Sequence, residues 1–167
     1  MLTYVIVIAA VVVVLFLSFR ALGGGEPVAA EDYRSLLARL LGYAAGRADQ
    51  LDAALSLPAT PVVAENGRKP LDPLVEAATG ARKALSGYQQ QLARIETEAG
   101  GDEREALLGA RSLLSAAIED YGWACRMVEA GGYRDNSGVR EAVDVLRSHA
   151  RDCMAATEQL VGGEEST

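Results

Sequence analysis

The chain has 167 residues, of which 23 are acidic and 16 basic, so its formal net charge at pH 7 is −7. No cluster of Lys and Arg stands out among these acids, and phosphate binding depends on such clusters, so we expect no nucleic acid among the partners of this protein. Abundant Ala, Val, Gly and Arg with very little Lys is typical of a bacterial genome rich in G and C.

The chain opens on an apolar segment, "MLTYVIVIAAVVVVLFLSFR". Residues 2–19 contain no charge, Gly or Pro, and as a helix they would span ~27 Å, just enough to cross the hydrocarbon core of a bilayer. No basic residue precedes the apolar run, as it would in a secretory signal. We therefore expect residues 1–20 to be a transmembrane anchor that is retained. The alternative is a signal peptide cleaved after Gly23.

The basic residues nearest the anchor indicate its orientation. Arg20, Arg34 and Arg39 all follow the apolar segment, and Lys and Arg resist translocation across the membrane. We expect a single-pass protein of the bacterial inner membrane, with residues 21–30 as a linker and the rest of the chain in the cytoplasm.

Beyond the linker, apolar residues recur at intervals of three and four, which is typical of helices that pack in bundles. The first predicted helix covers residues 31–57 and is followed by Pro58. The second begins after Asp72 as N-cap, with Pro73 in its first position. The apolar face of the first helix comprises Tyr33, Leu37, Leu40, Ala44, Ala48, Leu51 and Leu55. That of the second comprises Leu74, Ala78, Ala81, Leu85, Tyr88, Leu92 and Ile95.

Two further helices follow with the same spacing. Asp102 and Glu105 predict a capping box at the start of the third helix, and Gly131 and Gly132 end it. The fourth begins near Asn136 or Ser137. The apolar face of the third helix comprises Leu107, Ala110, Leu114, Ala117, Tyr121, Ala124 and Val128. That of the fourth comprises Val139, Val143, Leu146, Ala150, Cys153, Thr157 and Leu160.

Four helices of matched length, none able to bury its apolar face alone, predict an all-α fold in which an antiparallel four-helix bundle follows the anchor. The bundle covers residues 31–161, and residues 162–167 form a flexible tail. The alternative is a three-helix bundle with the first helix docked elsewhere, for example on a partner. The loop of residues 58–71 is either a simple connection or a recognition loop.

The sequence offers few residues for chemistry. His149 is the only histidine and shares a helix face with Cys153, which at most supplies half of a zinc site. The apolar faces carry no carboxylate for a di-iron centre, and the spacing of Cys125 and Cys153 places them too far apart for an intrachain disulfide. No third group is evident that would orient His149 toward a nucleophile. We therefore expect no metal, no cofactor and no enzymatic activity.

Two features of the predicted outer faces point to protein partners. The first is a set of glycines about two positions from an apolar stripe, where another helix could approach closely: Gly42, Gly46, Gly80, Gly87 and Gly109. The second is Trp123, the only tryptophan, with Glu119 and Arg126 beside it on the third helix. Trp and Arg are enriched among the residues that dominate binding energy at interfaces.

These patterns predict an accessory, assembly or scaffold subunit that is anchored in the lipid bilayer and presents its bundle to other membrane protein subunits. The bundle could also pair with a second copy of itself. The alternative function is a bundle that senses or binds a small molecule without an output domain of its own. Such a module would need a cavity or inward polar groups between its helices.

Overall fold

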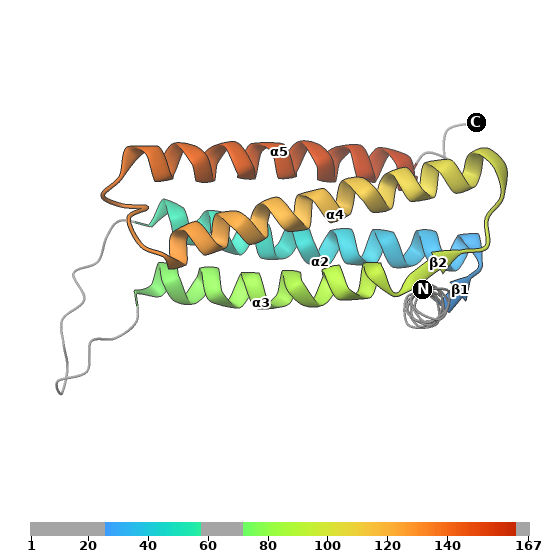
Figure 1. Cartoon of the computed structure of the whole chain (residues 1–167), viewed down its shortest axis with the longest axis horizontal. Helices are drawn as coiled ribbons and strands as arrows, with labels where there is room; N and C mark the ends of the chain where they lie inside the picture. The colour runs from blue at the N-terminus through green and yellow to red at the C-terminus, as the bar shows by residue number, and fades with distance from the viewer. Residues whose placement is uncertain (1–25, 58–71, 163–167) are drawn as a thin grey trace, which may run out of the picture.

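The computed structural model describes residues 26–57 and 72–162 (Figure 1). In this part of the chain, four long helices run alternately in opposite directions as an antiparallel bundle, which confirms the predicted helical bundle. They are α2 (Ala30–Ser56), α3 (Pro73–Ala93), α4 (Gly101–Glu129) and α5 (Ser137–Gly162). Helix α2 packs within the bundle, so the three-helix alternative is wrong.

The predicted anchor, the loop of residues 58–71 and most of the predicted tail lie outside the described residues. Within the described ranges, no helix is both long enough and apolar enough to cross a bilayer.

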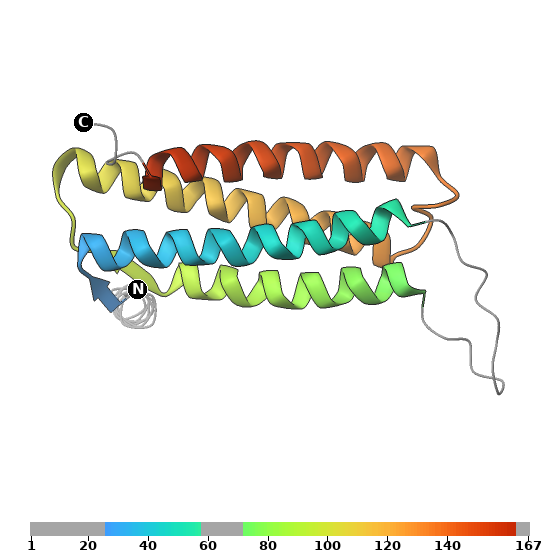
Figure 2. The ribbon, with the colours of Figure 1, turned by 180° about the vertical axis from the view of Figure 1, so that it is seen from behind.

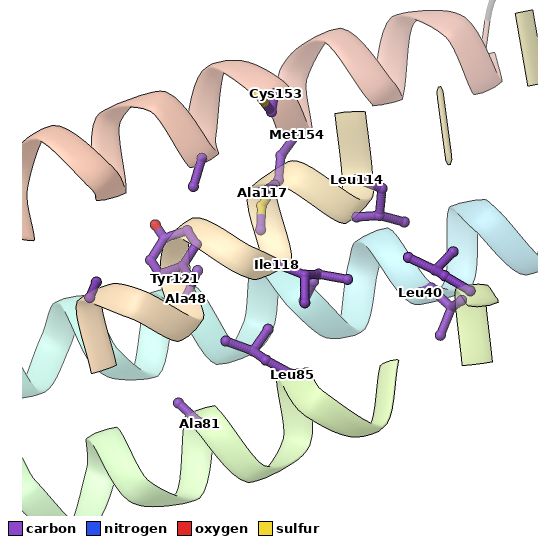
Figure 3. Packing of buried hydrophobic residues seen from close by; sticks show 14 of the residues in the cluster. Leu40, Ala48, Ala81, Leu85, Leu114, Ala117, Ile118, Tyr121, Cys153 and Met154 are labelled. Carbon is purple, nitrogen blue, oxygen red and sulfur yellow. The ribbon is translucent and has the colours of Figure 1, made fainter. Parts of the chain in front are cut away.

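Helix α4 supplies the largest share of the buried core. All seven residues of its predicted apolar face are buried, and Ile118 and Cys125, which were not predicted, join them. Figure 3 shows Ala117, Ile118 and Tyr121 between the neighbouring helices. Helix α4 packs extensively on both α3 and α5, whereas α2 and α5 contact each other far less. Among neighbouring helices, α2 and α5 are therefore the least closely packed pair. Figure 2 shows the bundle from behind, with α2 and α5 both in view.

The predicted start of α3 is confirmed. The Asp72 side chain accepts a hydrogen bond of 3.0 Å from the backbone N–H of Leu74, and Pro73 occupies the first turn. Because the first N–H groups of a helix have no partner within it, this cap satisfies one of them.

The predicted end of α3 is wrong. The helix ends at Ala93, and Ile95–Thr97 form strand β2, which pairs in parallel with β1 (Glu26–Val28). Ile and Thr favour extended backbone because their branched side chains pack well on a pleated surface. The strand pair ties the predicted linker to the bend between α3 and α4. With 21 residues, α3 is the shortest of the four described helices.

Two details of α4 and α5 also differ from the prediction. Helix α4 begins after Gly100 with no side-chain cap, so the capping box of Asp102 and Glu105 does not form. Gly101 has a φ of 56°, a left-handed conformation that suits glycine, and places Asp102 inside the first turn.

In α5, Leu160 is 40% exposed rather than buried. The predicted start of α5 is confirmed by Asn136, whose Oδ1 accepts a hydrogen bond of 2.9 Å from the N–H of Gly138.

Candidate functional site

Trp123 lies on the outer side of α4, as predicted. Its side chain is 48% exposed, an unusual position for the largest apolar residue type. The guanidinium carbon of Arg126 lies 4.6 Å from the centre of the indole ring. The two residues are three positions apart on a helix, so they share a face, and a cation over an indole face is attracted by the ring quadrupole. The pair therefore forms a flat, partly apolar surface that is already ordered.

A groove of about 290 Å³ adjoins Trp123 between α3 and α4. Helix α4 contributes Glu119, Gly122, Trp123 and Arg126, so the structure brings together the three predicted contact residues of this helix. The wall from α3 was not predicted, and its polar part comprises Arg82, Ser86, Gln89 and Gln90. No signal in the sequence pairs these residues with Trp123, because the register of α3 against α4 depends on the packing of the whole bundle.

Polar contacts hold the two walls of this groove in place. Arg82 donates from Nε to both carboxylate oxygens of Glu129, each at 2.9 Å. Gln89 donates a hydrogen bond of 2.7 Å to the hydroxyl of Ser115, while its own Oε1 is buried with no partner among the described residues. Because both walls are fixed from within, a partner would meet a preformed surface and lose less conformational freedom on binding.

The predicted glycines do not form one surface with Trp123. None of the five lines the groove beside Trp123, as far as the described residues show. A Cβ added at Gly42, Gly46, Gly80 or Gly87 would meet nothing within 4 Å, so there is open space beside all four. Gly42, however, lines a cavity between α2 and α5 and, contrary to the prediction, does not lie opposite the apolar face of α2. The prediction for Gly109 is wrong. A Cβ there would lie 3.8 Å from Leu160 Cδ1, which places Gly109 against α5.

A cluster of charges joins α2 to α5. Asp52 accepts a hydrogen bond of 2.5 Å from Arg147 Nε and is also bound by Arg151. Arg147 in turn contacts Asp144 at 2.8 Å. The side chains of Asp52 and Arg147 are only 17% and 14% exposed, so this contact is largely shielded from water. Sequence patterns did not reveal it, because its two sides are 95 residues apart.

His149 has an orienting group that the sequence did not reveal. Its Nδ1 lies 2.5 Å from Asp120 Oδ2, and its Nε2 lies 3.8 Å from the sulfur of Cys153. The expectation that no third group orients this histidine is therefore wrong. Burial raises the pKa of the Cys153 thiol, and the charges of Asp120 and Asp152 raise it further, so the reactive thiolate is disfavoured.

Within residues 26–57 and 72–162, no three or more His, Cys, Asp or Glu side chains are grouped so that they could hold a metal ion. Cys125 and Cys153 are both free and buried. Burial is the main cause that raises the pKa of Cys125, to about 12.

No protein-family model matches the chain, and neither a curated protein nor a solved structure shows significant similarity to it.

Proposed function

We propose that this protein is a membrane-anchored accessory or scaffold subunit, and that its bundle binds another subunit of a membrane complex through the groove beside Trp123. The observation that carries the proposal is the half-exposed Trp123, ordered by Arg126 and adjoining a preformed groove.

The chemistry of this surface favours a protein partner. Trp supplies a large, rigid contact area at a small cost in side-chain entropy, and both Trp and Arg are enriched among the residues that dominate binding energy at interfaces. Glu119, Arg126 and the amide of Gln90 offer polar groups of both signs around the indole. A surface of mixed charge on a chain with a net charge of −7 suits a protein segment better than a polyanion such as nucleic acid.

The membrane part of the proposal rests on residues 1–20. The length of residues 2–19 and their lack of charge favour a single span of the bacterial inner membrane, and Arg20, Arg34 and Arg39 favour a cytoplasmic bundle. An anchor would hold the bundle at the bilayer and raise its effective concentration near other membrane subunits.

The test is purification of the full chain from its native host in mild detergent, through a tag after Thr167. The extract is separated by size under native conditions, and the tagged band is analysed by mass spectrometry. We expect the wild-type chain to migrate with a stoichiometric partner, and Trp123→Ala to lose that partner while keeping its helical content.

Tyr43→Ala is the matched control. Tyr43 is 53% exposed and, like Trp123, contacts a neighbouring side chain, since its ring lies 5.9 Å from that of Tyr88. It lies on α2, away from the groove, and its removal should leave the partner bound. If the wild-type chain runs alone, or if both variants retain the partner equally, the proposal is wrong.

A further inference from the structure

A cavity with a volume of about 550 Å³ lies between α2 and α5. It exists because the facing positions of the two helices carry small residues: Ala38, Gly42 and Ala45 on α2, and Ala155 and Gly162 on α5. On α2 the lining runs from Ala38 to Asp49, which corresponds to ~16 Å along the helix axis. The cavity is therefore elongated and mainly apolar, and its volume falls within the range of small-molecule sites.

One buried polar group at this cavity lacks a well-formed hydrogen bond. Tyr121 lines the cavity from α4 and is 0% exposed, and its hydroxyl makes no hydrogen bond of regular geometry to any residue that the structure describes, although the guanidinium of Arg151 lies nearby. Figure 3 shows the ring next to Ala48, with its oxygen on the side of α5. A buried hydroxyl without a partner is costly, so one that lines a cavity is suited to a ligand that completes its hydrogen bonding.

Burial and the charge of Asp52 raise the pKa of Tyr121, although Arg151 opposes them. The hydroxyl therefore stays protonated at neutral pH, and it can both donate and accept a hydrogen bond.

The charges around the cavity select against anions. Asp49 and Glu158 line it, and neither carboxylate has a cationic partner among the described residues. Arg151 also lines the cavity, but it belongs to a cluster with Arg147, Asp52 and Asp144 in which the two positive and two negative charges cancel. An anionic head group would therefore meet two unpaired carboxylates and no net positive charge in this part of the chain.

We infer that the cavity between α2 and α5 binds an uncharged, elongated amphiphile, with its apolar chain along Gly42 and Ala45 and its single polar group at the hydroxyl of Tyr121. This site is distinct from the protein-binding groove proposed above, because it lies between a different pair of helices.

The test uses photolabelling of the full chain in lipid nanodiscs. The probe is an eight-carbon alcohol that carries a photoreactive diazirine, and the matching carboxylic acid serves as the charged comparison. Labelled residues are mapped by peptide mass spectrometry, which separates labelling in the cavity from labelling elsewhere in the chain. We expect the alcohol to label residues 38–49 and 151–162 saturably, and the acid to do so at least 10-fold less well.

Two pairs of variants test the assigned positions. Gly42→Leu fills the cavity and should reduce saturable labelling at least five-fold. Gly46→Leu is its control and should leave the labelling unchanged, because Gly46 lies one turn further along α2, is equally open and does not line the cavity. Tyr121→Phe removes only the hydroxyl and should raise the half-saturating concentration of the alcohol about 2- to 10-fold, as expected for one hydrogen bond. Tyr33→Phe is its control, since the hydroxyl of Tyr33 is also buried without a described partner but lies outside this cavity.

Circular dichroism establishes that each variant is folded. Equal labelling by the alcohol and the acid would overturn the inference, as would equal effects of Gly42→Leu and Gly46→Leu. Absence of saturable labelling between α2 and α5 would also overturn it, and would indicate that another occupant, such as a second copy of the chain, fills the cavity.

Discussion

Replacing Asp52 by Ala should destabilise the bundle more than a substitution that breaks any other ion pair among the described residues. Asp52 binds Arg147 and Arg151, and its removal leaves the largely buried guanidinium of Arg147 with only Asp144, whose side chain is 60% exposed. Breaking a fully buried pair costs about 3–5 kcal/mol, whereas an exposed pair contributes about 0–1 kcal/mol. Since Arg147 and Asp52 are 14% and 17% exposed and one contact survives, we expect a loss of about 2 kcal/mol in the free energy of unfolding.

The assay is urea unfolding of the full chain at a fixed detergent concentration, followed by far-ultraviolet circular dichroism. Glu103→Ala is the control, because its partner Arg34 is 25% exposed and Glu103 itself 43% exposed, and we expect a loss of about 0.5 kcal/mol or less. The slope of the free energy against urea should not change, because neither variant alters the surface exposed on unfolding.

A double variant tests whether the effect arises from the pair itself. Arg147→Met combined with Asp52→Ala removes both charges and should be less destabilising than the sum of the single variants, by about 1 kcal/mol or more. If Asp52→Ala costs no more than Glu103→Ala, the reasoning from burial is refuted, and the charges must be as well hydrated in the folded chain as in the unfolded one.

Two further predictions concern single residues. Since burial raises the pKa of Cys125 to about 12, almost no thiolate exists at pH 8. We therefore expect maleimide to modify Cys125 at least 100-fold more slowly in the native chain than in urea, and equal rates would contradict its burial. Gly80→Ala should stabilise the bundle by about 0.5–1 kcal/mol, because the new Cβ meets nothing within 4 Å and glycine is a poor helix former. Gly131→Ala should instead destabilise the bundle by about 1 kcal/mol, because Gly131 has a φ of 85°. Urea unfolding measures the free energy of unfolding of both variants, and a change in the same direction for both would contradict the assigned backbone conformations.

The helices whose apolar residues recur at regular intervals were the most predictable part of the fold. The spacing of apolar residues from Leu107 to Val128 predicted the buried face of α4, and Asp72 followed by Pro73 predicted the start of α3. Both signals arise from residues within one helix, so they do not depend on how the helices are arranged.

The features that the sequence missed depend on contacts between distant segments. Ile95 continues the helical spacing of α3, yet it lies in β2 because a strand far earlier in the chain pairs with it. The register that brings Asp52 to Arg147, or Asp120 to His149, likewise follows only from the packed bundle.

The candidate site was predictable in part. Helical spacing placed Trp123 beside Arg126 on an outer face, and the structure confirms that arrangement. The groove itself needed the opposing wall of α3, with Ser86 and Gln90, whose position opposite Trp123 no local pattern indicates.

The most direct test of the proposed function is photo-crosslinking in the native host from a single position in the groove. A photoreactive amino acid replaces Ser86, which lines the groove beside Trp123, and in a control chain it replaces Ala53, an exposed residue of α2 outside the groove. We predict that light links the chain modified at position 86 to one membrane subunit, and that Trp123→Ala abolishes this product. A product of equal yield from position 53, or none from position 86, would contradict the proposal that this groove is where the bundle meets its partner.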